Sequence, residues 1–296
     1  MVFNISNTTD TFDSVNTANT SPHAARFFGL LAQQAAVLLQ IESTQGSAPR
    51  EAGTWMAVFA HELVGTIGGG HLEHEAISQA REQLRSQNTE NAEARTLKRQ
   101  RFALGPSLGQ CCGGVVHLLF EPVSAQDLPA LRTRLQQSLH PLALFGGGHV
   151  GHALVEVLAR LPFSLTWIDS RDGVFPQPAP AGVCCEHSEP VQSAVSELVA
   201  GTRVLIMSFS HAEDLDVLAA CLQRQRDKAD LPYIGLIGSH SKWATFQHRL
   251  EARGFSSAEL AHVTCPIGVP GITGKEPEVI AIAVAAQLLQ SISKTG

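Results

Sequence analysis

The sequence predicts an α/β protein in two parts: a C-terminal doubly wound parallel sheet, preceded by a smaller, glycine-rich α+β domain. From residue 141 onward, short runs that are apolar throughout alternate with segments of helical period, which is typical of parallel strands covered on both faces. Before residue 126, strand-like runs are separated by three glycine-rich loops and few helices. We therefore expect a polar tail at 1–22, an α+β domain at 23–125, a linker helix at 126–139 and the sheet domain at 140–296.

Composition narrows the classes of function. The 296 residues are 44% hydrophobic and 16% charged, which suits a folded protein with a sizeable core. The net charge of −6, without a long basic run, argues against nucleic-acid binding. No apolar stretch is long enough to span a membrane. The tail, rich in Asn, Thr and Ser, lacks the pattern of a secretory signal, and we expect it to be disordered. Six cysteines in such a chain indicate free thiols and a cytoplasmic protein.

The periodicity places the individual elements. In the first part we expect helices at 23–34 and 71–87, the second with acidic residues in its first turn, and strands at 35–42, 54–60, 64–67, 94–103 and 115–121. A polar helix at 127–138 follows. In the second part we expect strands at 141–145, 164–169, 183–186, 202–207 and 233–237, and helices at 148–161, 191–200, 215–224, 242–253 and 277–291.

The loop that follows the first strand of the second part has the pattern Gly146-x-Gly148-x-x-Gly151 and opens a helix. Such glycines permit a tight turn, close approach of a phosphate, and close packing of helix on strand, and this context predicts Rossmann topology. Asp169 ends the next strand and could accept hydrogen bonds from ribose hydroxyls. His149 could contact a phosphate or only cap the helix. The alternative is a glycine-rich turn that binds no nucleotide.

Three further loops carry groups that could bind an anion. Gly68, Gly69 and Gly70 precede the helix at 71–87, and helix starts attract anions. Arg50 lies in the loop at 46–50, and its planar guanidinium suits phosphate or carboxylate. Lys275, near the start of the last helix, could hold a phosphate or be a solvated lysine. For each loop alone, an ordinary turn is the competing interpretation.

The segment at 104–114 carries Gln110, Cys111 and Cys112 among glycines and other small residues. A thiolate in such a loop would be accessible, and it is a soft metal ligand. The alternative is a pair of small buried apolar residues. Adjacent cysteines lack the spacing of a structural zinc site. Cys184 and Cys185 fall on an expected strand, and we expect them in the core.

Taken in order, these stretches resemble the XdhC-like family of xanthine dehydrogenase accessory proteins. The residues that carry the resemblance are GSAPREAGTWM (46–56), GTIGGGHLE (65–73), LGPSLGQCCGGVV (104–116), LFGGGHVGHAL (144–154), YIGLIGS (233–239) and CPIGVPGITGKEPEVIA (265–281). Each motif alone is weak, but the ordered set spans most of the chain and is quite specific.

The resemblance implies a molybdenum-cofactor chaperone rather than a catalyst. Such a protein binds molybdopterin as cargo, holds it while its terminal sulfur ligand is installed, and helps insert it into xanthine dehydrogenase. The implied partners are the molybdenum subunit of the dehydrogenase and a cysteine desulfurase. Independently of the resemblance, we expect a homodimer, because dimers are the commonest oligomers. Our candidates for binding the cofactor are Arg50, Gly68, Gly69, Gly70, Gln110, Cys111, Cys112, Gly146, Gly148, His149, Gly151, Asp169, His211 and Lys275, with Cys111 and Cys112 as candidate metal ligands.

One position departs from the family pattern. A His-x-His pair often follows the fourth strand of the second domain, but here Phe209 stands at its first position and His211 at its second. A role that needs both histidines is therefore not expected. Two other classes remain: an NAD(P)-dependent oxidoreductase that binds its nucleotide at the loop 146–151, and a module with a vacant Rossmann domain.

Overall fold

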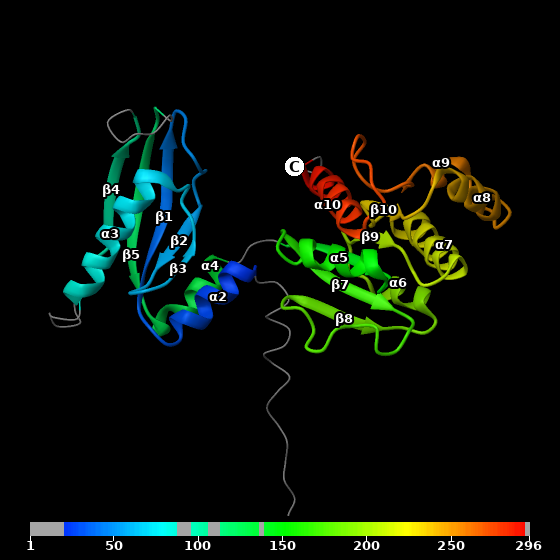
Figure 1. Ribbon diagram of the computed structural model, residues 1–296, viewed down its shortest axis with the longest axis horizontal. Helices are drawn as coiled ribbons and strands as arrows, with labels where there is room; N and C mark the ends of the chain where they lie inside the picture. Colours follow the sequence, from blue (N-terminus) through cyan, green and yellow to red (C-terminus); the bar gives the residue numbers. More distant parts are fainter. Residues whose placement is uncertain (1–20, 88–95, 106–112, 136–138, 294–296) are drawn as a thin grey trace, which may run out of the picture. The chain divides into compact units, whose positions relative to one another are not determined.

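The computed structural model describes residues 21–87, 96–105, 113–135 and 139–293, and every structural statement below concerns these residues. They form two compact units that divide at Gln136 and Gln137, and each unit is described by itself (Figure 1). Residues 1–20 of the expected tail lie outside the described ranges.

The N-terminal unit is built on a five-stranded antiparallel sheet with the order β3-β2-β1-β5-β4. The strand β1 is central, because Leu39 lies opposite Met56 on one side and Phe120 on the other. The strands are β1 (Ala36–Gln45), β2 (Trp55–Val58), β3 (Leu63–Gly65), β4 (Lys98–Ala103) and β5 (Val115–Val123).

Helices cover both faces of this sheet. Alternate residues of β1 point to opposite faces, so they pack against different helices. Val37, Leu39 and Ile41 share one buried cluster with α3 (Gly70–Gln87). Ala36 and Leu38 share another with α2 (Pro22–Leu31) and α4 (Leu128–Arg134). The sheet therefore lies between two buried layers of side chains.

The segment expected as a linker helix packs on the N-terminal unit. It consists of the 3-10 turn η2 (Ala125–Asp127) and α4. Leu131 and Leu135 are buried in the same cluster as Phe27 of α2, and Arg132 lies over the Phe28 ring at 5.5 Å. Residues up to Leu135 therefore complete the core of this unit.

The C-terminal unit contains a six-stranded sheet, parallel throughout, with the order β11-β10-β9-β6-β7-β8. The first and fourth strands in chain order, β6 and β9, are neighbours, so the strand order reverses between them, as in a Rossmann fold. The strands are β6 (His140–Phe145), β7 (Phe163–Asp169), β8 (Val183–His187), β9 (Arg203–Ile206), β10 (Tyr233–Leu236) and β11 (Val263–Thr264).

Each face of the parallel sheet is covered by its own helices. Leu142 and Leu144 of β6 pack with α5 (His149–Leu158) and α10 (Pro277–Ser293). Ala143 and Phe145 pack with the other group of helices: α6 (Ala194–Glu197), α7 (His211–Lys228), α8 (His240–Glu251) and α9 (Ser257–Leu260). The sheet is therefore doubly wound, as the sequence predicts.

Three details of this unit differ from the expectation. The helix expected at 191–200 is only the 3-10 turn η3 (Val191–Ser193) followed by the four residues of α6. The helix ends there because Leu198 is extended. The chain then turns at Gly201, with φ +83°, to enter β9. The strand β11 has only two residues, too few for periodicity to reveal. Cys184 is exposed and Cys185 half-buried, because β8 is an edge strand.

We predict that Gly151→Ala destabilises the protein by about 1–3 kcal/mol, the usual cost of overpacking. An added Cβ at Gly151 would lie 2.2 Å from the carbonyl oxygen of Gly146, and this clash outweighs the gain in helix propensity. Urea denaturation measures the change. Gly148→Ala is the matched control, because its Cβ meets nothing within 4 Å. Equal stability of the two variants would contradict the packing argument.

Candidate functional site

The loop between β6 and α5 has the close packing that its glycines predict. Gly146 has φ +127°, and a Cβ there would lie 2.0 Å from the carbonyl oxygen of Met207. The indole Nε1 of Trp167 donates to the carbonyl oxygen of Gly146 at 2.9 Å. Gly146 and Gly151 thus let the loop, the helix and two strands meet at the point where the strand order reverses.

Gly148 and His149 are the part of this loop that is open to a ligand. Both are exposed, and Gly148 precedes α5 in an extended conformation without a side-chain cap in the described structure. The first amides of a helix have no partner within the helix, and its dipole favours an anion there. An anionic group could therefore approach the backbone beside His149.

Asp169, at the end of β7, is bonded to the loop and to the next turn. Its side chain is buried; Oδ2 accepts from the Gly147 amide at 2.6 Å and from Nη2 of Arg171 at 2.9 Å. Oδ1 accepts from the backbone amide and from Nε of Arg171, both at 2.9 Å. Burial alone would raise the pKa of Asp169, but the hydrogen bonds from Arg171 and Gly147 outweigh it and hold the pKa below its usual value.

This arrangement changes what the expected nucleotide contact can be. An ionised carboxylate offers about four lone-pair positions, and four donors already use those of Asp169. A ribose hydroxyl would find no free acceptor there. The structure therefore uses Asp169 to hold the loop, and this geometry does not favour the ribose contact.

An exposed aromatic ring lies beside this network. Phe209 is 66% exposed, and the guanidinium of Arg171 lies over its ring at 4.5 Å. His211, two residues further on, is exposed at the start of α7, and its ring meets the edge of Phe246 at 6.3 Å. The structure thus brings the loop, Asp169 and His211 to one edge of the sheet, because the carboxyl ends of parallel strands share an edge.

A buried ion pair at the same edge was not predicted from the sequence. Nζ of Lys242 donates to Oδ2 of Asp214 at 2.7 Å and to the carbonyl oxygen of Ile237 at 2.9 Å. Oδ1 of Asp214 accepts from the Ser208 amide at 2.7 Å. The pair joins the ends of β9 and β10 to α7 and α8. No local signal pairs these residues, which are 28 positions apart.

The thiol of Cys265 near this edge is not an activated nucleophile. Burial raises its pKa to about 11, and the charge of Lys242 only partly opposes the shift. Cys221, in the core under α7, has a pKa raised to about 12 by burial. Both thiols therefore remain protonated at neutral pH.

In the N-terminal unit, the loops that carry Arg50 and Gly68 are in contact. Gly68 has φ +120°, and a Cβ there would lie 2.6 Å from Cβ of Pro49 and 3.5 Å from Cγ of Arg50. Gly68 therefore permits this contact, while Arg50 itself is exposed.

The glycine-rich loop before α3 is closed by an acid of its own helix. Oε2 of Glu73 accepts from the amides of Ile67 and Gly69, both at 3.0 Å, and from the Thr66 hydroxyl at 2.5 Å. The Gly68 amide donates to Oγ1 of Thr66 at 3.1 Å. These amides are no longer open donors, so in this pair of loops the exposed guanidinium of Arg50 is the group best suited to an anion.

Gln110, Cys111 and Cys112 lie outside the described residues, but the two ends of their segment are described. The Leu104 amide donates to the Gly114 carbonyl at 2.8 Å. Gly114 packs so closely on the Arg50 loop that a Cβ would lie 2.3 Å from the carbonyl oxygen of Ser47. Gly114, which follows the segment with the two cysteines in the chain, therefore lies against the loop of Arg50.

Other expectations concern metals, membranes and Lys275. Within the described ranges, no three His, Cys, Asp or Glu side chains are grouped as a metal site requires. The helices of the same ranges are all too short or too polar to cross a membrane. Lys275 is exposed, and its amide donates to Oε2 of Glu276 at 2.9 Å.

We predict that Asp169→Asn lowers the free energy of unfolding at pH 7 by about 3 kcal/mol, the low end for breaking a buried pair, because Arg171 is 35% exposed. The lowered pKa means that the ionised pair stabilises the protein above the unfolded-state pKa of about 4, and that this contribution is lost as the pH falls through the folded-state pKa. The deficit of the variant should therefore shrink in acid.

Urea denaturation from pH 7 downward tests this prediction. Asp216→Asn is the matched control, since Asp216 pairs with Arg253 on the surface and should contribute less than about 1 kcal/mol. A deficit independent of pH would contradict the assigned role of the Asp169 charge.

Comparison with known proteins gives consistent relatives for both units. The model of the XdhC Rossmann domain matches residues 142–288, and the model of the XdhC and CoxI family matches residues 30–96. The uncharacterized protein YqeB of Escherichia coli (strain K12) is 25% identical over 254 residues, which are 86% of this chain and 43% of YqeB. The chain thus spans less than half the length of that curated relative.

A solved structure agrees with the fold. The crystal structure of a protein described as a xanthine dehydrogenase from Bacillus halodurans has a TM-score of 0.73 and 20% identity, and the match covers 94% of this chain and 97% of that one. The parallel sheet described above is the domain that the first family model represents, and the second model falls on the N-terminal unit. This chain belongs to the XdhC family.

Proposed function

We propose that this chain is an accessory protein for the maturation of xanthine dehydrogenase. In this proposal it binds molybdenum cofactor as cargo, holds it while the terminal sulfur ligand of the metal is installed, and helps transfer it to the molybdenum subunit of the dehydrogenase. Membership of the XdhC family supports the connection with xanthine dehydrogenase.

The observation that carries the proposal is the contact between the Arg50 loop and the end of the segment that bears Cys111 and Cys112. Gly114 packs on Ser47, three residues before Arg50, and Pro49 packs on Gly68. Molybdopterin carries a phosphate and a dithiolene-bound metal. A guanidinium suits the first and a thiolate suits the second, and in this proposal Arg50 and the two cysteines supply these groups.

The C-terminal unit supports a carrier over an NAD(P)-dependent oxidoreductase. The carboxylate that a dehydrogenase would use for ribose is saturated by Gly147 and Arg171. The open groups of the loop are the backbone at Gly148 and His149 and the nearby ring of Phe209. These groups can hold an anionic or planar part of a cofactor.

The proposal includes partners and a location. A cysteine desulfurase would supply the sulfur, and the apo-dehydrogenase would receive the loaded cofactor, both in the cytoplasm. A homodimer is the expected assembly, because most soluble oligomers are symmetric dimers. In this role the chain is a carrier and not a catalyst.

The proposal predicts that Arg50→Ala and the double variant Cys111→Ala/Cys112→Ala retain less cofactor. Each removes a charged or metal-binding contact, so we expect a loss of about tenfold or more in affinity. The protein is produced in cells that make molybdenum cofactor, and molybdenum and pterin are measured on the purified chain. The same samples are then tested for activation of apo-xanthine dehydrogenase.

Matched controls separate the site from general effects. Arg26→Ala removes an exposed arginine of α2, and Cys184→Ala removes an exposed thiol of the other unit. Both should retain cofactor as the unmodified chain does. Undiminished retention by the Arg50 and thiol variants would reject the assigned residues, and binding of NAD(P) without retention of cofactor would favour the oxidoreductase.

A further inference from the structure

One buried charge in the described part of the C-terminal unit has no ionic partner among the described residues. Four charged residues of the described ranges are buried: Asp169, Arg203, Asp214 and Arg224. The others pair with Arg171, Lys242 and Asp230 respectively. Arg203 is 3% exposed, and no acidic side chain pairs with it among the described residues. A buried cation without a counter-charge is costly, so its position requires a physical reason.

The hydrogen bonds of Arg203 compensate only part of its positive charge. Arg203 is the first residue of β9, and its Nε donates to Oγ of Ser291 at 2.9 Å while Nη2 donates to the Ser291 carbonyl at 3.3 Å. These contacts place it at the C-terminal turn of α10, where the helix dipole supplies about half a negative charge. A guanidinium has five N–H donors, and the remaining ones are left for another acceptor.

Arg203 lines a cavity of about 720 Å³ at the amino end of the parallel sheet. Most of its wall is apolar and includes Pro141, Leu231, Pro232 and Ile292. The polar groups beside Arg203 are His140, Gln225 and Asp230. A largely apolar wall with a few convergent polar groups is the usual construction of a site for a small organic ligand.

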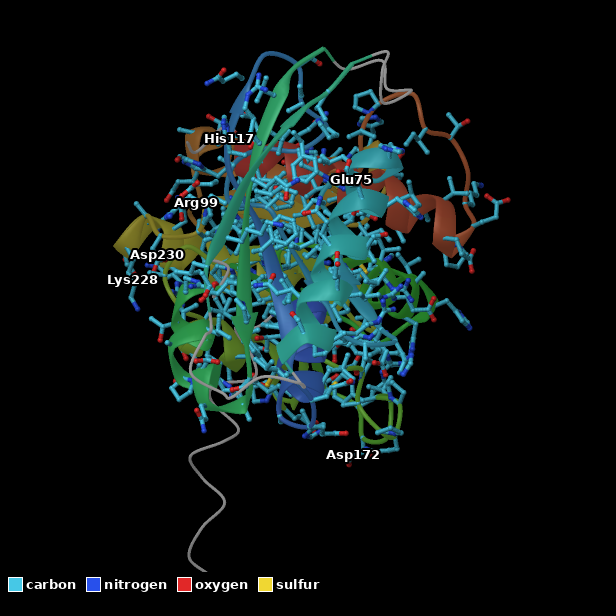
Figure 2. The ribbon with its side chains drawn as sticks, turned by 90° about the vertical axis from the view of Figure 1, so that its left-hand side faces the viewer. Glu75, Arg99, His117, Asp172, Lys228 and Asp230 are labelled. Atoms are coloured by element: carbon cyan, nitrogen blue, oxygen red, sulfur yellow. The ribbon has the colours of Figure 1, made fainter. Side chains whose placement is uncertain are left out.

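The polar groups leave this cavity positive. Oδ1 and Oδ2 of Asp230 accept from Nε and Nη2 of Arg224 at 2.8 and 2.7 Å, so the one carboxylate of the lining is already paired. Lys228 lies next to Asp230 at the end of α7 and adds a further positive charge (Figure 2). The unpaired charge of the lining is therefore that of Arg203.

Two neutral groups can add hydrogen bonds to an anion. Oε1 of Gln225 accepts from the Leu231 amide at 2.9 Å, which leaves its amide nitrogen as a donor. Burial and the charge of Arg203 lower the pKa of His140, so its imidazole is neutral at pH 7 and can donate one N–H. The effect of Arg203 on His140 also indicates that the two groups are close in space.

We propose that this cavity binds a small organic oxyanion, a carboxylate or phosphate on an apolar body, with its charged head on Arg203. The site lies at the amino ends of β6 and β9, whereas the glycine-rich loop, Asp169 and His211 follow the carboxyl ends. It is therefore a second site in the same unit and does not depend on the proposed cargo.

Thermal unfolding of the full chain tests the proposal with benzoate, phenyl phosphate and inorganic phosphate, each against chloride at equal ionic strength. We expect benzoate or phenyl phosphate to raise Tm, and the more effective one identifies the head group. Arg203→Met should lower the affinity for that probe about tenfold or more. Arg253→Gln, which removes a surface arginine paired with Asp216, should leave the affinity unchanged.

A second readout locates the ligand and holds even if Arg203→Met does not fold. The NMR signals of the His140 imidazole, assigned by comparison with His140→Gln, should shift on titration, and its pKa should rise because an anion now lies beside it. Ile292→Trp, which narrows the cavity, should weaken binding. Equal effects of all anions and chloride, or a shift in Tm with no change at His140, would overturn the proposal.

Discussion

The carboxylate of Asp169 is the constraint on which the C-terminal unit depends. It lies at the end of β7 and accepts from the amide of Gly147, in the loop after β6, so two neighbouring strands end in one hydrogen-bonded group. Arg171 forms an ion pair with this carboxylate, and its guanidinium lies over the exposed ring of Phe209. The edge of the sheet where ligands usually bind is therefore organised by an internal acid.

Glu73 has the same role in the N-terminal unit. It accepts from two amides and a hydroxyl of the loop before α3, as Asp169 accepts from the loop before α5. In each loop the acid accepts from amides that the glycine pattern would otherwise offer to an anion. The groups left for a cargo are then specific side chains and the outer backbone: Arg50 in one unit, and Gly148 and His149 in the other. This arrangement suits a protein that must both hold a cofactor and release it.

The two ends of the parallel sheet differ in their chemistry. At the carboxyl ends, the buried carboxylates of Asp169 and Asp214 are each paired with a cation. At the amino ends, Arg203 is buried without an acid and lines a cavity with mostly apolar walls. The helix termini of α7 and α10 at that end supply only partial negative charge. In our proposal, a bound anion offsets part of the free-energy cost of burying the charge of Arg203.

Local pattern was enough to predict most of the fold. The sequence signals are clearest for four strands, because both faces of each are buried and most of their residues are apolar: β6, β7, β9 and β10. The signal for the helix α5 is also clear. The failures have physical causes. At β8 an edge position leaves Cys184 exposed, and after α6 the chain turns at Gly201 to reach β9. The two residues of β11 are held by pairing with β10 rather than by any pattern of their own.

The sequence by itself determined the two-part organisation, the Rossmann topology and the family, because these follow from periodicity and from motifs that are local in the chain. Only the tertiary structure decided which groups are satisfied. A glycine-rich loop has the same sequence whether its amides meet a phosphate or the carboxylate of Asp169, 22 residues away. The unpaired state of Arg203 is likewise a fact of packing, since Arg203 and its contact Ser291 are 88 residues apart.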